Sequence, residues 1–249
     1  MNISVIVRTH NDGLVIEECL NKVFSQKLSG DVEYILVDEK SEDDTLRKAK
    51  AFSFNKVVSS SEFNAAITLN KAYSLAKGSV IINVLGHTVP VDNYVFDRLV
   101  SNLKMDDIGA VYGRQLPHPK GDSFLNVLFS LGYTEKPAEK KFLSLALSAT
   151  KKALWDKVPF EEEFVPAEDK AWSIAMRKLG FKIMYEPKAA ALHFHKMDLK
   201  RIFIRNFKMA KAHKKIGISK LRHYSLIHYA FLNDVRYLEK KYLLFFSPI

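Results

Sequence analysis

Two adjacent carboxylates, Glu168 and Asp169, have the residue type and the setting that acid–base chemistry requires. They follow Pro166, and the apolar spacing beyond them predicts a helix over residues 167–179. Both side chains would lie in its first turn, where free backbone N–H groups and the helix dipole favour ionised carboxylates. An ionised carboxylate in a cleft can take a proton from a hydroxyl group. Ordinary helix capping is the alternative interpretation of the same residues.

Composition limits the class of protein. The chain has 249 residues, of which 47% are hydrophobic, enough to bury the core of one large domain. Cys19 is its single cysteine, which excludes an internal disulfide and a cysteine-rich metal site. No apolar run reaches the length of a membrane span, and residues 3–7 are interpreted as a strand rather than a signal peptide. The net charge of +10 favours anionic partners.

Strand-like apolar runs alternate with amphipathic segments through the first hundred residues. This order predicts an α/β fold with a mostly parallel sheet that is covered by helices on both faces. Polar side chains follow the runs directly, among them Thr9, Asn11, Asp38 and His87. Because ligands of open α/β sheets bind beyond the carboxyl ends of the strands, we expect these side chains to line one ligand site.

The patterns also predict the individual elements. Strands are expected over residues 3–7, 33–37, 56–58, 79–84, 142–149 and 182–185, an extended edge piece over 189–193, and helices over 12–24, 41–52, 64–76 and 91–103. Residues 113–138 are rich in proline and glycine, which predicts loops around one short helical patch at 124–129. From Asp198 onward the chain is expected to be helical and strongly basic.

Six segments carry a pattern in a fixed order: Ser4–Asn11, Tyr34–Thr45, Asn64–Asn70, Gly109–Pro117, Ala167–Trp172 and Ala190–His195. Together they resemble the inverting family 2 glycosyltransferases, which have the Rossmann-like GT-A fold, and within them the bacterial rhamnosyltransferases. The resemblance implies a catalytic domain over 1–197, with a nucleotide-binding half at 1–105 and an acceptor-binding half at 106–197. A helical extension over 198–249 would follow it.

Inverting glycosyl transfer is a single displacement, which needs a base for the acceptor hydroxyl and charge stabilisation on the departing diphosphate. The resemblance implies that Asp169 is the base, with Glu168 in support. The residues expected to bind the donor nucleotide are Thr9, Asn11, Asp38, Asn70 and His87. Asp38 would accept the imide N–H of uracil or thymine and so select a UDP- or dTDP-linked sugar. The residues expected on the acceptor side are Arg114, Gln115 and Trp172.

The metal motif of the resembled family is absent. The family has Asp-x-Asp, or a single Asp, at the end of the fourth strand, where it holds a divalent metal on the diphosphate. Here Leu85 and His87 occupy the two acidic positions. Magnesium prefers oxygen ligands, whereas an imidazole suits softer transition metals. The family's manganese or magnesium ion is therefore expected only if other side chains replace these carboxylates.

Three outcomes stay open for the diphosphate. A metal is held by His87 together with His193 or His195, which alternate along a predicted strand and point to one face. Alternatively, cationic side chains bind the diphosphate without metal. Arg201 and Arg205 lie one helical turn apart, and each guanidinium can bind a phosphate group in a bidentate manner. In the third outcome the chain has lost its activity.

The basic and aromatic residues of 198–249 predict an amphipathic extension that contacts an anionic membrane surface. Packing of this extension against the catalytic domain is the alternative. The resemblance implies a cytoplasmic protein in the synthesis of cell-envelope polysaccharide, which lies at the inner face of the cell membrane where the extension contacts lipid.

The predicted activity is transfer of a sugar, rhamnose or another hexose, from a nucleoside diphosphate to a glycan or a lipid-linked glycan. The alternative is a non-catalytic relative that binds a nucleotide or a partner transferase, because Leu85 and His87 replace acidic residues. Nucleic-acid binding is not expected, since no helix-turn-helix, zinc or RNA-recognition signature accompanies the positive charge.

Overall fold

The sheet begins with the predicted run of buried strands. β1 (Ile3–Thr9) lies between β2 (Val32–Asp38) and β4 (Val80–Leu85), β3 (Lys56–Ser59) follows β2, and all four are parallel. This computed structural model describes residues 2–60, 64–121, 137–140, 142–195 and 199–218. Parallel pairing brings the carboxyl ends of these strands, and the polar residues that follow them, to one edge of the sheet.

The second half of the sheet is mixed, which corrects the prediction of a mostly parallel sheet. Its strands are β5 (Thr88–Pro90), β6 (Ile108–Pro117), β7 (Ala138–Lys140), β8 (Leu147–Lys151) and β9 (Lys182–His193). β8 runs antiparallel to both β4 and β6, and β5 and β7 run antiparallel to β9. An antiparallel strand joins a sheet without the crossover helix that a parallel neighbour requires. Because β4 pairs with β8, the two predicted halves of the domain share one sheet.

Three predictions about the later strands are wrong. β6 extends to Pro117, since residues 114–117 pair with residues 190–193, so the loop predicted from residue 113 begins only after Pro117. β9 is one strand that lies between β6 and β5 rather than an edge piece at 189–193. The predicted strand at 142–149 begins only at Leu147. The helical patch predicted at 124–129 lies outside the described residues.

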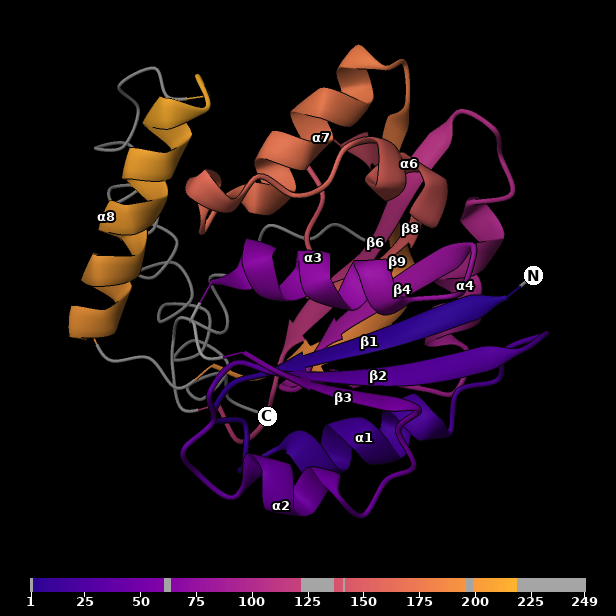
Figure 1. Ribbon diagram of the computed structural model, residues 1–249, viewed down its shortest axis with the longest axis vertical. Coiled ribbons are helices and arrows are strands. Elements are labelled where there is room, and N and C mark those ends of the chain that lie inside the picture. Colours follow the sequence, from indigo (N-terminus) through magenta and orange to yellow (C-terminus); the bar gives the residue numbers. More distant parts are fainter. Residues whose placement is uncertain (1, 61–63, 122–136, 141, 196–198, 219–249) are drawn as a thin grey trace, which may run out of the picture.

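Helices cover both faces of the sheet, as predicted (Figure 1). α1 (Ile16–Phe24) and α4 (Val95–Asn102) pack on one face, where Ile16, Leu20, Phe96 and Leu99 are fully buried. α3 (Ala65–Leu75), α6 (Lys152–Lys157) and α7 (Glu168–Lys178) pack on the other. The short helix α2 (Thr45–Ala49) lies beside α1, and the 3₁₀ turn η1 (Glu162–Phe164) precedes α7.

The boundaries of three helices follow from their local chemistry. The side chain of Asn64 accepts hydrogen bonds from the backbone N–H groups of Ala66 and Ile67, at 3.0 and 3.2 Å, so α3 begins where the sequence predicts. The helix predicted over 91–103 begins later, because Pro90 still belongs to β5 and the Asp92 carboxylate accepts from Tyr94 N at 2.8 Å. The helix predicted over 41–52 shrinks to the five residues of α2.

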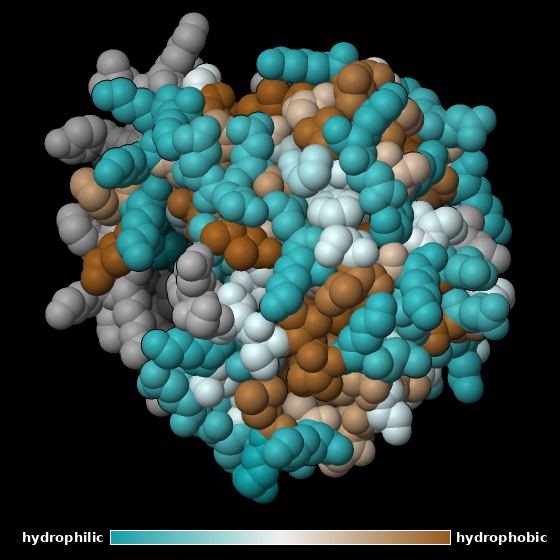
Figure 2. Space-filling model, in the orientation of Figure 1, coloured by the Kyte–Doolittle hydropathy of each residue, from teal (hydrophilic) through white to brown (hydrophobic). Residues whose placement is uncertain are grey.

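α8 (Leu199–Lys215) confirms the predicted helix after Asp198 and stands next to α7 (Figure 1). Within the described residues, no helix is both long enough and apolar enough to cross a membrane. The face shown in Figure 2 is mostly hydrophilic, with apolar side chains in separate patches. The rest of the predicted extension, residues 219–249, lies outside the described part of the chain.

Gly113 sits where β6 changes register against β9, just before Arg114 and Gln115. A Cβ atom at this position would meet the backbone carbonyl of Ala189 far inside van der Waals contact and lie 2.5 Å from Leu147 Cδ2. A side chain therefore has no room here unless the two strands move apart. Gly113 thus permits the close approach of β6 to β9, and this approach places the residues that follow it at the sheet edge.

We predict that Gly113→Ala lowers the free energy of unfolding by about 1–3 kcal/mol, the usual cost of overpacking a filled core. The measurement is urea denaturation. The control is Gly109→Ala on the same strand, where the nearest atoms are side-chain atoms of Leu154 and Phe181 at 3.0 Å, so a smaller loss is expected. Equal losses in the two variants would contradict the structural argument.

Candidate active site

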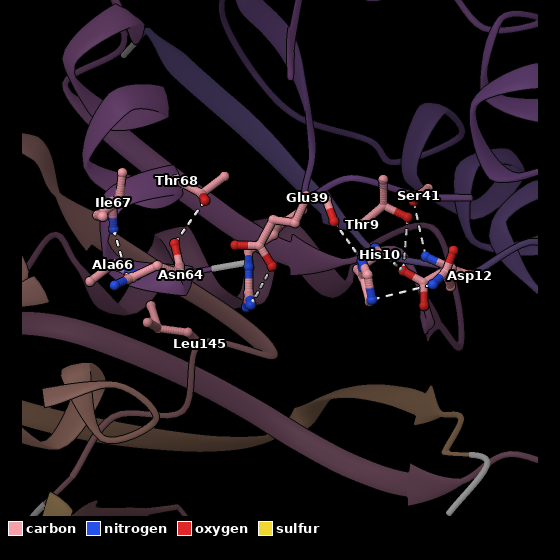
Figure 3. A network of polar contacts seen from close by, with 12 residues as sticks. Thr9, His10, Asp12, Glu39, Ser41, Asn64, Ala66, Ile67, Thr68 and Leu145 are labelled. Carbon is pink, nitrogen blue, oxygen red and sulfur yellow. Dashed lines mark hydrogen bonds and ion pairs between the residues drawn. The ribbon is translucent and has the colours of Figure 1, made fainter. Parts of the chain in front are cut away.

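The carboxyl ends of β1 and β2 carry a dense polar network (Figure 3). Arg8 forms an ion pair with Glu39, with 2.8 Å between Nη2 and Oε2, and the Glu39 side chain is 1% exposed. Thr9 Oγ1 donates to Asp12 Oδ2 at 2.8 Å, and His10 N donates to the same oxygen at 3.2 Å. The predicted gathering of polar side chains at this edge of the sheet is therefore present in the fold.

Asp12 joins this network to the turn after β4. Its Oδ1 atom lies 2.8 Å from His87 Nδ1, so the carboxylate contacts residues that are 75 positions apart from it in the chain. A Cβ atom at Gly86 would lie 2.7 Å from both Asp12 Oδ2 and Thr9 Oγ1, so only glycine permits this approach. Burial acts to raise the pKa of Asp12, but the charge and hydrogen bond of His87 outweigh it and hold the pKa below its usual value.

His87 belongs to a cluster of three imidazoles with His193 and His195. The ring centroids lie 5.0 Å apart for His87 and His193, 5.3 Å for His87 and His195, and 4.2 Å for His193 and His195. β5 pairs antiparallel with β9 and places Thr88 opposite His193, which brings the two segments together. One nitrogen atom of each ring lies within 4.8 Å of those of the other two, and the predicted grouping of these residues is therefore present.

Two imidazoles of the cluster, those of His193 and His195, are kept neutral by their surroundings. Burial lowers the pKa of His193 well below its ordinary value, and the charges of His195, His87 and Arg205 lower it further. Burial, together with His87 and Arg205, lowers the pKa of His195 to about 3. A neutral imidazole carries a free lone pair on one nitrogen. A metal ion binds through such a lone pair, whereas a diphosphate does not need one.

The first turn of α7 provides the predicted carboxylate pair. Burial raises the pKa of Glu168, and the charges of Arg8 and Glu39 act on it in opposite directions. These couplings place Glu168 near the ends of β1 and β2. Burial, followed by the neighbouring charge of Glu168, raises the pKa of Asp169 to about 7. A carboxyl group with this pKa is divided between its acid and base forms near neutral pH, which suits general-base chemistry.

α8 closes the site beside α7. Lys170 Nζ lies 2.6 Å from His213 Nε2, and burial lowers the pKa of Lys170. The charge of Arg205 lowers the pKa values of Lys170, His193 and His195, so this guanidinium lies near both the first turn of α7 and the histidine cluster. Arg201, predicted beside it, lies on α8, but its side chain is outside the described part.

Asp38 and Asn11 lie at the same edge of the sheet. Asp38 Oδ2 accepts from Ser41 N at 3.0 Å, while its Oδ1 is buried and has no hydrogen-bond partner among the described residues. The Asn11 side chain accepts from the backbone N–H of Glu42 at 2.8 Å, and its backbone has a φ of 53°. Asn11 therefore shapes the turn before α2 as well as standing near the predicted donor site.

Two predicted site residues lie in structural contacts instead. Asn70 Oδ1 accepts from Trp155 Nε1 and from Phe160 N, both at 3.0 Å, so this amide ties α3 to the α6 region. Trp172 is 2% exposed, and its indole N–H donates to Val158 O at 2.9 Å. The structure places neither residue with the polar cluster at the strand ends.

On the predicted acceptor side, Gln115 contacts the histidine cluster through a short hydrogen bond between its Oε1 and His193 Nδ1. Arg114, its neighbour on β6, is half-buried. Four residues of the site were not predicted from the sequence: Arg8, Asp12, Glu39 and Lys170. A signal for two of them existed, since Glu39 directly follows β2 and Asp12 lies in the loop after β1, as the predicted site residues do.

Comparison with known proteins identifies the family. Residues 4–162 match glycosyl transferase family 2, and the chain belongs to this family. It is 27% identical over 219 residues to the O-antigen chain rhamnosyltransferase WbaN of Salmonella anatum, covering 82% of this chain and 70% of that protein. It is 26% identical over 225 residues to RfbN of Salmonella typhimurium, also an O-antigen chain rhamnosyltransferase, covering 83% and 71%.

Solved structures show the same GT-A fold. The mannosyltransferase PcManGT of Pyrobaculum calidifontis, in complex with GDP-Man and Mn²⁺, matches with a TM-score of 0.68 at 19% identity, over 88% of this chain and 64% of that one. Glucosyl-3-phosphoglycerate synthase of Mycobacterium tuberculosis, with Mn²⁺, UDP and phosphoglyceric acid, matches with a TM-score of 0.65 at 19% identity, over 88% and 80%. The predicted family and fold class are thus confirmed.

The family's divalent metal can be tested against the residues present. Leu85 offers no ligand atom, and both oxygens of Asp12 already accept hydrogen bonds. The Nε2 atoms of His87 and His193 are buried without a hydrogen-bond partner among the described residues. Buried polar atoms of this kind need a partner, and an ion supplies one. The donor set therefore fits a divalent ion that accepts imidazole ligands.

The raised pKa of Asp169 predicts how stability varies with pH. The folded protein holds the Asp169 proton more tightly than the unfolded chain, so its stability falls as pH rises from about 4 to about 7. Asp169→Asn removes this penalty. We expect the variant to be more stable than the natural chain at pH 8, on the order of 2 kcal/mol, and the difference to vanish at pH 4.

The matched control is Asp44→Asn. A hydrogen bond from Lys48 is the main cause that lowers the pKa of the exposed Asp44, so its ionised form stabilises the fold above pH 4. Asp44→Asn should therefore change stability in the opposite direction, and slightly. The measurement is chemical denaturation at both pH values. A loss of stability in Asp169→Asn at pH 8 would contradict the assigned pKa direction.

Proposed function

We propose that this protein transfers a sugar from a nucleoside diphosphate to a glycan hydroxyl with inversion, and that Asp169 is the general base. The observation that carries the proposal is the first turn of α7, where Asp169 has a pKa raised to about 7. The coupling of its neighbour Glu168 to Arg8 and Glu39 relates this turn to the sheet edge where donors bind in such folds.

In the proposed reaction Asp169 takes the proton of the acceptor hydroxyl while that oxygen attacks the anomeric carbon of the donor. The bond between this carbon and the diphosphate oxygen breaks in the same step, and the diphosphate leaves with its negative charge. Arg205 is the proposed partner of that charge, because a guanidinium stays protonated and binds phosphate in a bidentate manner. Glu168 supports the base by keeping the proton affinity of Asp169 high.

The histidine cluster is the proposed cation site. His87, His193 and His195 would hold a divalent ion, which neutralises charge on the diphosphate when it is bound. The lowered pKa values of His193 and His195 support this role, because only neutral imidazoles donate a lone pair. The solved relatives that contain Mn²⁺ also contain GDP-Man or UDP, which supports a joint donor and metal site.

The proposed donor carries uracil or thymine, and rhamnose is the proposed sugar. The base would pair its imide N–H with Asp38 Oδ1, a buried acceptor with no partner among the described residues. Rhamnose follows from the resemblance to WbaN and RfbN, both rhamnosyltransferases of O-antigen chains. Those names also support a growing polysaccharide chain as acceptor. A cytoplasmic location at the membrane face remains part of the same proposal.

We predict that Asp169→Asn abolishes sugar transfer, by 10³-fold or more, because the acceptor proton then has no base. In the natural chain, kcat/KM should rise with pH through about 7, as Asp169 loses its proton. Steady-state assays with dTDP-rhamnose, UDP-glucose and UDP-N-acetylglucosamine measure both effects.

The control is Glu161→Gln, an exposed carboxylate before η1, which should keep full activity. Thermal shift with dTDP and UDP should show unchanged nucleotide binding in both variants, since a ligand of the folded state raises the midpoint. Full turnover by Asp169→Asn would remove the base assignment. Nucleotide binding in a natural chain that transfers no sugar would favour the non-catalytic alternative.

A second prediction concerns base recognition by Asp38. Asp38→Ala removes the buried acceptor and should weaken binding of dTDP and UDP by about 10-fold or more, the effect of one lost charged hydrogen bond. Binding of ADP, whose base has no ring N–H to donate on its pairing edge, should change little, so that discrimination between pyrimidine and adenine nucleotides falls. Thermal shift and calorimetric titration measure the three affinities. An equal loss for all three nucleotides would show that Asp38 does not read the base.

A further inference from the structure

We propose that His87, His193 and His195 form a three-imidazole site that prefers zinc-like transition metals to magnesium and manganese. Asp12 and Gln115 act as positioning residues that turn two of the rings toward the ion. The inference deepens the proposed function, because it names the class of ion that the donor site takes. Metal binding itself is measured without donor or acceptor, so it does not depend on catalysis.

Asp12 fixes the orientation of His87. Its Oδ1 atom lies 2.8 Å from His87 Nδ1, and a carboxylate only accepts hydrogen bonds. His87 therefore carries its proton on Nδ1, which leaves the lone pair on Nε2. That Nε2 atom is buried and has no hydrogen-bond partner among the described residues. Carboxylate, imidazole and ion in this order form the arrangement in which metal-binding histidines are commonly held.

Gln115 performs the same task for His193. The amide nitrogen of Gln115 donates to Ser144 Oγ at 2.8 Å, which turns the amide oxygen toward His193. This oxygen accepts from His193 Nδ1, so the His193 lone pair also lies on Nε2. The atom is again buried, without a hydrogen-bond partner in the part of the chain that the structure describes. Two separate residues thus prepare two imidazoles in the same way.

His195 completes the site. Its ring centroid lies 4.2 Å from that of His193 and 5.3 Å from that of His87. The candidate ligand atoms of the three residues lie within 4.8 Å of one another. Nitrogen ligands about 2.1 Å from a tetrahedral ion lie about 3.4 Å apart, so small side-chain rotations bring the rings to one ion. His195 lies two residues beyond the end of β9 and is part-buried.

The ligand set decides which ion binds. Both Asp12 oxygens are occupied by hydrogen bonds from Thr9, His10 and His87, so this carboxylate stays behind the imidazole. Magnesium requires oxygen ligands, and manganese binds nitrogen sites most weakly of the common divalent transition metals. Three imidazoles therefore favour zinc and cobalt. These ligands therefore do not favour manganese, the ion present in the solved relatives.

The test uses the untagged full chain after removal of metal with a chelator. Cobalt is titrated and followed by its visible absorption, and zinc, manganese and magnesium are then added as competitors. We expect one cobalt per chain, full displacement by zinc, and manganese affinity at least 100-fold weaker than that of zinc. Manganese or magnesium binding as tight as zinc binding would overturn the inference.

Variants assign the ligands and the positioning residues. His87→Ala and His193→Ala should lower cobalt affinity by 100-fold or more, while Asp12→Asn and Gln115→Ala should each lower it by 10- to 100-fold. Asp92→Asn, a carboxylate paired with Arg98 away from the cluster, is the control and should leave affinity unchanged. If Asp12→Asn fails to fold by circular dichroism, Gln115→Ala carries the same test.

Binding and transfer then separate the two proposals. Zinc binding that depends on His87, in a chain that transfers no sugar, supports the metal site and refutes the proposed enzyme. Sugar transfer by a chain that binds neither zinc nor cobalt refutes the metal site and leaves the enzyme in place. Unchanged cobalt affinity in both histidine variants also refutes the site.

Discussion

The hydrogen bond between Asp12 and His87 is the interaction on which the site depends. Asp12 is buried, and an unpaired buried carboxylate costs several kcal/mol (about 3–5) in a folded protein. Its two oxygens therefore need donors, and they find them in Thr9, His10 and His87. In meeting this demand, one side chain joins the loop after β1 to the turn between β4 and β5.

This constraint extends to the rest of the sheet edge. The turn that His87 occupies leads into β5, and β5 pairs with the last residues of β9, so Thr88 lies opposite His193. The position of the histidine cluster therefore follows from two independent interactions. One is the pairing of β5 with β9, and the other is the hydrogen bond between the buried Asp12 carboxylate and His87. Gly86 permits both, because a larger residue there would separate Asp12 from Thr9.

Sequence reasoning located the elements whose signals are local and missed the contacts that depend on strand order. The β1, β2 and β4 runs, the α3 helix and the α7 helix each follow from short patterns. β8 and β6 were misjudged because an antiparallel insertion between β4 and β6 leaves no periodic signal. Asn70 was predicted at the donor site, yet its amide satisfies a buried indole and a loop backbone, a demand that only packing reveals.

The extension after residue 197 had two alternative interpretations, docking on the domain and contact with a membrane, and α8 has a face for each. Arg205, Met209 and His213 recur every four residues and lie on one side, where Lys170 contacts Met209 Sδ and His213 Nε2. Ile204 and Phe207 are 43% and 64% exposed on the same helix. The charge of Arg205 therefore acts on the site, while Lys208 and the exposed apolar residues lie at the surface. A helix that packs through one face leaves its other face exposed, so the docking of α8 is compatible with the proposed membrane contact.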